Sequence, residues 1–229
     1  MMRRLFTAAT IAVALTMPAA AQTPAPTTSV PQPSETPPSH EAAKPAAHLD
    51  GFRGAKWGMS EAEVKAVIAD EFKIPVDKLG TEVNPAERTT VLPILVPDLI
   101  EGAGNARVSY IFGYQTKKLI EVNILWGTPV DPQAKSEMVI AAANQLRDLF
   151  ATQGYDPATM VTNARASDGS VVVFSGQDAD KHTTLLRLVQ TQAAPREGRT
   201  KPPVSTTLLL SYILDSKNPD IFRLKSGSF

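Results

Sequence analysis

Residues 108–126 read VSYIFGYQTKKLIEVNILW, and this stretch settles the class of fold. Apolar residues alternate in the first run, Val108 to Tyr114, and again in the second run, Leu119 to Trp126. Two runs of period two around the polar turn 115–118 predict an antiparallel hairpin. An aromatic row at this spacing is typical of a sheet core, and an exposed face that stacks on a ligand is the alternative.

A helix is predicted before this hairpin and another after it. Ser60-Glu61-Ala62-Glu63 has the form of a capping box, and apolar residues at helical spacing then predict a helix over 60–72. Asp131 and Pro132 predict a second helix, with Asp as N-cap and Pro at its first position. Its apolar stripe runs from Met138 to Phe150, and Gly154 follows as the stop.

Further strands are expected at about 52–57, 88–95, 170–175, 182–191 and 204–214. The predicted fold is therefore α+β, with an antiparallel sheet of about six to seven strands and two main helices on one face. A helix followed by a hairpin occurs twice in this order. Because residue identity between the halves is slight, a tandem helix-hairpin repeat and a chance repetition both stay open.

The N-terminal residues have the pattern of an export signal. Arg3 and Arg4 precede a short apolar run and Ala19-Ala20-Ala21, so residues 1–21 are expected to be a signal peptide cleaved before Gln22. An uncleaved membrane anchor is the alternative, but about 13 apolar residues span only ~20 Å as a helix, less than a hydrocarbon core. The mature chain is thus expected to be periplasmic or secreted and to have no transmembrane segment.

Residues 22–48 contain seven prolines among 27 residues and are otherwise rich in Ala and Thr. Such a segment buries too little apolar surface to offset its ordering entropy, so we expect a disordered linker. It would reach up to ~80 Å in an extended proline-rich conformation. A single α+β domain is expected to follow over 49–229.

Composition excludes several classes of function. The chain has no cysteine, which excludes thiol catalysis, thiolate metal sites and disulfides. Removal of Arg3 and Arg4 leaves 21 basic and 23 acidic residues. A nearly balanced chain has no overall field that would attract nucleic acid.

Two short patterns resemble those of known proteins. FRGxxWGMSxxEV at 52–64 and YxF at 110–112 resemble a recurrent pattern in small, uncharacterised exported bacterial proteins. More distantly, the chain is similar to SmpA/BamE-like and β-lactamase-inhibitor-like α+β modules. The resemblance implies a binding or assembly module of the cell envelope rather than an enzyme. The chain departs from the lipoprotein members by lacking a cysteine, and from the usual glycine-containing hairpin turn at Gln115–Lys118.

The sharpest cluster of potential ligands is Asp178-x-Asp180-x-His182. In an extended strand these side chains would share one face and could hold a divalent ion. The alternative is a hairpin turn in which the aspartates bond their own backbone, and we expect this alternative. His40 and His48 fall in the expected linker. We therefore predict no catalytic, cofactor-binding or metal-binding residue and no cofactor.

A basic loop is the best partner-contact candidate in the sequence. Arg196, Arg199 and Lys201 lie among prolines between two strands, where they could contact an acidic envelope protein or an anionic envelope polymer. The sequence thus favours a periplasmic, non-enzymatic binding or envelope-assembly module. An envelope hydrolase acting through carboxylates and a small-ligand carrier are the alternatives.

The first prediction concerns export. Protein recovered from the periplasm should begin at or near Gln22, because Ala19-Ala20-Ala21 satisfies the small-residue rule for signal cleavage. Intact mass spectrometry measures the N-terminus, and periplasmic protein that retains Met1 would contradict export through a cleaved signal.

Overall fold

A computed structural model describes residues 45–192, 204–224 and 227 of the chain. The signal peptide, most of the linker and the basic loop with Arg196, Arg199 and Lys201 lie outside the described residues. The elements are β1 (Gly51–Phe52), β2 (Ala55–Lys56), α1 (Glu61–Phe72), the 3-10 helix η1 (Val76–Lys78), β3 (Glu82–Val83), β4 (Thr90–Val96), β5 (Ala106–Phe112), β6 (Leu119–Gly127), α2 (Ser136–Ala151), β7 (Val161–Arg165), β8 (Val171–Gln177), β9 (Thr183–Gln192) and β10 (Val204–Ile213).

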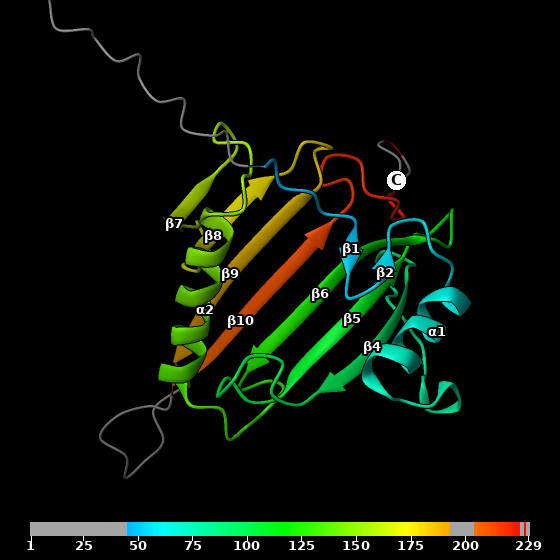
Figure 1. The fold of residues 1–229 in the computed structure, drawn as a ribbon, viewed down its shortest axis with the longest axis horizontal. Coiled ribbons are helices and arrows are strands. Elements are labelled where there is room, and N and C mark those ends of the chain that lie inside the picture. Colours follow the sequence, from blue (N-terminus) through cyan, green and yellow to red (C-terminus); the bar gives the residue numbers. More distant parts are fainter. Residues whose placement is uncertain (1–44, 193–203, 225–226, 228–229) are drawn as a thin grey trace, which may run out of the picture. The chain divides into compact units, whose positions relative to one another are not determined.

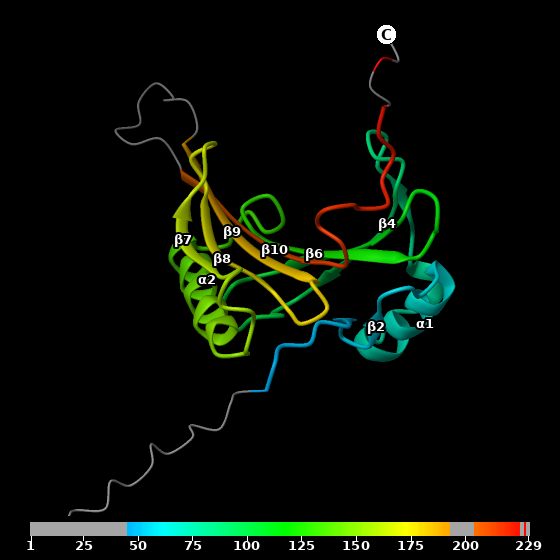
Figure 2. The ribbon, with the colours of Figure 1, turned by 90° about the horizontal axis from the view of Figure 1, so that it is seen from above.

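Eight of these strands form one antiparallel sheet in the order β3-β4-β5-β6-β10-β9-β8-β7. Each helix is followed along the chain by four consecutive strands, and the two groups of four meet where β6 pairs with β10 (Figure 1). The arrangement of elements is therefore duplicated about the centre of the sheet. The α+β class and the antiparallel sheet are confirmed, and Figure 2 shows both helices on the same side of the sheet.

The sheet has eight strands rather than six or seven because β3 and β7 were not predicted. β3 has two exposed residues, and β7 is an edge strand whose five residues are mostly exposed. Neither strand presents a row of side chains to the core, so neither has the alternating apolar residues from which strands are predicted. The predicted strand at 52–57 is instead two short strands, β1 and β2, which pair with each other.

The core lies between the helices and the face of the sheet that carries the predicted aromatic row. Tyr110, Phe112 and Trp126 are each at most 1% exposed, which confirms their assignment to the core. From the helices, Val64 and Ile68 of α1 and Val139 and Phe150 of α2 are buried in the same cluster. Alternation along β5 and β6 therefore directs every second side chain towards the helices.

The predicted capping box is present at the start of α1. The carboxylate of Glu63 accepts a hydrogen bond from the Ser60 backbone nitrogen at 2.7 Å, and Ser60 is the N-cap. This hydrogen bond satisfies a backbone donor that has no partner within the helix. The helix ends at Phe72, and Lys73 follows in the left-handed conformation.

The start predicted for the second helix is wrong. α2 begins at Ser136 with Lys135 as its N-cap, so Asp131 does not cap it. Asp131 instead accepts hydrogen bonds from the backbone nitrogens of Gln133, at 2.9 Å, and Asn105, at 3.1 Å. Its carboxylate closes a local turn and joins two loops, which is the other common use of an aspartate before proline.

The packed domain begins before the expected boundary at Leu49. The Ala47 backbone nitrogen donates to the Gly154 carbonyl at 2.9 Å, and the Ala47 side chain is buried. Gly154 has a φ of +78°, and a Cβ there would collide with the Pro45 carbonyl. Residues 45–48, including His48, therefore pack against the domain and are not part of the linker. Within the described chain, no helix combines the length and hydrophobicity needed to cross a bilayer.

The second prediction tests the start of α1. Ser60→Ala should lower the free energy of unfolding by about 1 kcal/mol, because it removes the side-chain cap. Ser167→Ala, in the exposed turn before β8, is the control and should change the free energy by less than about 0.5 kcal/mol. Urea unfolding followed by circular dichroism measures both. Equal effects of the two variants would show that the cap does not stabilise the helix.

Candidate functional site

Asp178, Asp180 and His182, for which the sequence predicts an aspartate turn rather than a metal site, lie between β8 and β9. The side chain of Asp178 is fully buried and accepts three hydrogen bonds from backbone nitrogens. Its Oδ1 accepts from the backbone nitrogens of Asp180 and His182, at 3.0 and 2.8 Å. Its Oδ2 accepts from the Leu49 backbone nitrogen at 2.7 Å and lies 3.1 Å from Nδ1 of His182. A carboxylate has about four lone-pair sites, and backbone donors occupy three of them while the His182 ring faces Oδ2.

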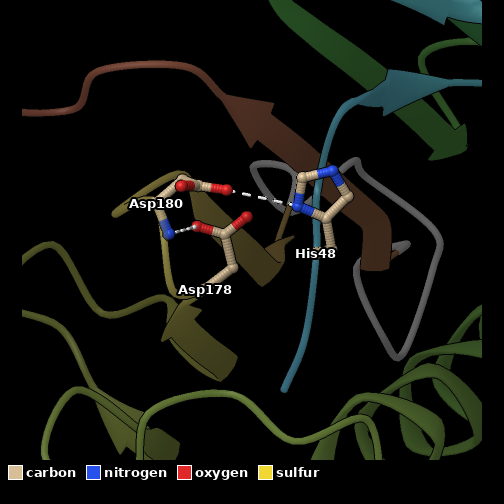
Figure 3. A group of neighbouring side chains, drawn as sticks. All are labelled: His48, Asp178 and Asp180. Atoms are coloured by element: carbon tan, nitrogen blue, oxygen red, sulfur yellow. Dashed lines mark hydrogen bonds and ion pairs between the residues drawn. The ribbon is translucent and has the colours of Figure 1, made fainter. Parts of the chain in front are cut away.

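His48 completes a cluster that the sequence could not show, because it lies 130 residues before Asp178. One ligand atom from each of His48, Asp178 and Asp180 lies within 4.8 Å of the others (Figure 3). His48 Nδ1 is 3.2 Å from Oδ2 of Asp180, and both side chains are more than half exposed. His182 faces Asp178 instead and is not a member of this cluster.

We assign the cluster to fastening of the chain rather than to metal binding. Asp178 joins the β8–β9 turn to Leu49, where the packed N-terminal segment enters the domain. The indole nitrogen of Trp57 donates to the Leu49 carbonyl at 2.7 Å, so both polar backbone groups of Leu49 are bonded to side chains. The expected aspartate turn is thus present, although its central carboxylate is buried rather than solvated.

The face of the sheet opposite the helices carries a different set of side chains. Arg107 of β5, Leu125 of β6, Leu209 of β10 and Arg187 of β9 are successive cross-strand neighbours and form one row across the sheet. Both leucines are partly exposed. No helix of the described chain covers this side of the sheet (Figure 2). We call this surface, centred on the four-residue row, the open face.

A carboxylate pairs with the arginine at each end of the row. Glu82 of β3 accepts from Nη2 of Arg107 at 2.8 Å. Asp168, in the turn before β8, pairs with Nη2 of Arg187, whose Nε also donates to Ser170 Oγ at 2.7 Å. Hydrogen bonds from Ser170, with a further contribution from Arg187, lower the pKa of Asp168, so it is ionised at neutral pH. The two arginines are thereby held at equivalent places in the two halves of the sheet.

The neighbouring row of the open face mixes polar and apolar groups. Asn123 of β6 lies opposite Ser211 of β10, and Ser211 Oγ donates to Asn123 Oδ1 at 2.5 Å. Leu185 of β9 continues this row beyond Ser211 and is partly exposed. The centre of the open face is therefore a patch of leucines beside a hydrogen-bonded polar pair, with ionic groups at its margins.

The sequence contains one indication of this surface, and a search for alternating apolar residues does not find it. Two strands have consecutive apolar residues, which point to both faces of the sheet: Leu208-Leu209-Leu210 and Ile124-Leu125-Trp126. A strand with one solvated face would instead alternate apolar and polar residues. Such runs indicate a strand that is covered on both faces. In the described chain, helices cover only one of those faces.

Comparison with protein-family models, with curated proteins and with solved structures finds no match. The resemblance to exported envelope modules therefore stays a prediction.

The third prediction tests the Asp178 fastening. Asp178→Asn should lower the free energy of unfolding by about 2–3 kcal/mol, because an amide replaces one acceptor oxygen by a donor that faces backbone N–H groups. Asp180→Asn removes an equal charge from an exposed side chain and should cost less than about 0.5 kcal/mol. Urea unfolding compares the two, and similar losses would contradict a specific role for Asp178.

Proposed function

We propose that this chain is an exported, non-enzymatic binding module whose open face receives a protein partner. The observation that carries the proposal is the row Arg107–Leu125–Leu209–Arg187, whose leucines are partly exposed on a face without helices. Apolar side chains grouped on a surface, with polar and ionic groups around them, are typical of protein interfaces. The predicted signal peptide and linker support an activity in the cell envelope, at the end of a tether.

The charges of the open face favour a protein over an anionic polymer. Each arginine of the row already pairs with a carboxylate, Glu82 or Asp168, so its charge is largely compensated. A polyanion would have to compete with these carboxylates and would leave the leucines in contact with water. A partner with apolar side chains would instead bury Leu125 and Leu209, and arginine and large side chains often dominate such contacts.

The position of the row also favours binding without rearrangement. Leu125 and Leu209 lie on the two central strands, each of which is hydrogen-bonded to a neighbour on both sides. Little conformational entropy is lost when a partner docks on a surface that is already ordered. The resemblance to envelope binding modules points in the same direction and remains untested.

The fourth prediction tests the open face directly. A photo-cross-linking amino acid at position 125 or 209, in cells that export the protein, should yield the same covalent adduct with one other protein. The same residue at position 149, which is half exposed on α2, should not yield that adduct. With the partner purified, Leu125→Thr combined with Leu209→Thr should weaken the complex at least about tenfold, and Leu149→Gln less than about twofold.

Threonine is chosen because it preserves strand preference, and thermal melts should confirm that both variants fold. An adduct with twice the mass of this chain would mean that the open face pairs with a second copy, and it would overturn the proposal of a different protein. Equal adducts from positions 149 and 209 would show that the open face has no selective partner.

A further inference from the structure

The segment after β10 crosses one end of the open face. We call residues 214–222 the strap. The Leu214 backbone nitrogen donates to the Ile120 carbonyl at 2.9 Å, and the Asp220 carbonyl accepts from the Tyr114 backbone nitrogen at 2.8 Å. The strap is therefore bonded at its start to β6 and near its end to the β5–β6 turn. Further along, the Phe222 backbone nitrogen donates to the Glu87 carbonyl at 2.8 Å.

The carboxylate of Asp220 strengthens the second of these attachments. It accepts hydrogen bonds from the backbone nitrogens of Gln115, at 3.0 Å, and Thr116, at 2.9 Å, and from Thr116 Oγ1 at 2.6 Å. Burial acts to raise the pKa of Asp220, but these hydrogen bonds outweigh it and hold the pKa below the ordinary value. A Cβ at position 113 would collide with this carboxylate, so Gly113 allows the close approach.

Between the strap and the ends of β6 and β10 lies a cavity of about 270 Å³, which we call the strap pocket. Its apolar walls include Ile120, Ile213, Leu214 and Pro219. A dry apolar cavity of about 150 Å³ holds a benzene molecule, so this volume accepts a short alkyl chain with a polar head.

The charged groups of the strap pocket are mainly acidic. Glu121, Asp215 and Asp220 line it together with one cation, Lys118. Asp215 accepts hydrogen bonds from the backbone nitrogens of Lys217 and Asn218, both at 2.9 Å, and Asp220 accepts three. Hydrogen bonds with Ser60 lower the pKa of Glu63 in the capping box, and the charge of Lys118 adds a smaller contribution.

Glu121 differs from the two aspartates of the strap pocket because, within the described chain, its carboxylate accepts no backbone hydrogen bond. It lies on β6 directly opposite Ile213 of β10 and is partly buried. Within the described part of the chain, no ion pair includes Glu121. Burial raises the pKa of Glu121, Asn123 opposes this shift, and the negative charge of Glu87 adds to it. A positive group in the strap pocket would favour the ionised form of Glu121.

We propose that the strap pocket binds an aliphatic cation, with its alkyl chain against Ile213 and Pro219 and its charged head at Glu121. The acidic lining and the apolar walls complement the two parts of such a ligand. The cation can be a free alkylamine or the side chain of a lysine or arginine from another protein, since both present the same chemistry. The inference does not depend on a partner at the open face.

The fifth prediction uses three ligands with five carbon atoms each that differ in charge. n-Pentylammonium should bind with a Kd on the order of 1 mM, as expected for a ligand of about six heavy atoms. n-Pentanol should bind at least about tenfold more weakly, and pentanoate more weakly still, because it adds a like charge. NMR titration of backbone amides at 118–121, 213–218 and 220 measures all three Kd values and locates the site.

Glu121→Gln preserves the shape of the side chain and should abolish the tenfold preference for pentylammonium over pentanol. Glu137→Gln removes an exposed charge from the first turn of α2, on the other side of the sheet (Figure 2), and should preserve this preference. The affinity for pentylammonium should also fall as the pH is lowered through the raised pKa of Glu121, since protonation removes the counter-charge. The Glu121→Gln variant should lack this pH dependence.

The tripeptide Gly-Lys-Gly distinguishes the two sources of the cation. If it binds with the affinity of pentylammonium, the strap pocket accepts a basic side chain; if only the free amine binds, the ligand is a small molecule. Equal affinity for pentanol and pentylammonium, an unchanged preference in Glu121→Gln, or amide shifts outside the strap pocket would overturn the proposal. None of these measurements involves the protein partner of the open face, so the two proposals fail separately.

Discussion

The pairing of β6 with β10 is the interaction on which the rest of the structure depends. Seven residue pairs, from Thr207 with Gly127 to Ile213 with Glu121, join two antiparallel groups of four strands into one sheet. Each group alone would expose a central strand edge, and such an edge invites aggregation. Their union removes that edge and places Leu125 beside Leu209. It also places Glu121 beside Ile213, so the same ladder generates the open face and the floor of the strap pocket.

Buried or bonded aspartates hold the irregular segments in place. Asp178 secures the N-terminal entry, Asp131 joins two loops, and Asp220 ties the strap to the β5–β6 turn. In each case a carboxylate accepts hydrogen bonds from backbone N–H groups, a charge-assisted interaction stronger than a neutral hydrogen bond. A chain without cysteine cannot fasten such segments with disulfides, and these carboxylates supply the equivalent long-range connections.

The two proposed binding features share one surface. The strap crosses only one end of the open face, and the remainder keeps its leucines partly exposed between two paired arginines. A protein docked on the leucines would lie close to the strap pocket, because Glu121 and Leu125 are on the same face of β6. A basic side chain of that protein could then reach Glu121. The strap pocket would in that case contribute to the choice of partner as well as to affinity.

Local chemistry explains which parts of the fold could be read from the chain. The capping box at Ser60, the 108–126 hairpin and the strands β8 to β10 depend on neighbours close in sequence, and all are present. The predicted start of α2 was wrong because Asp131 accepts a hydrogen bond from Asn105, a residue 26 positions away, and does not cap the helix. Which face of a strand is left uncovered depends on where the helices pack, and Asp220 meets Gln115 across 105 residues. The alternation of residues along a strand indicates neither the face that the helices cover nor a contact between distant residues. The positions of the open face and the strap pocket therefore follow only from the tertiary structure.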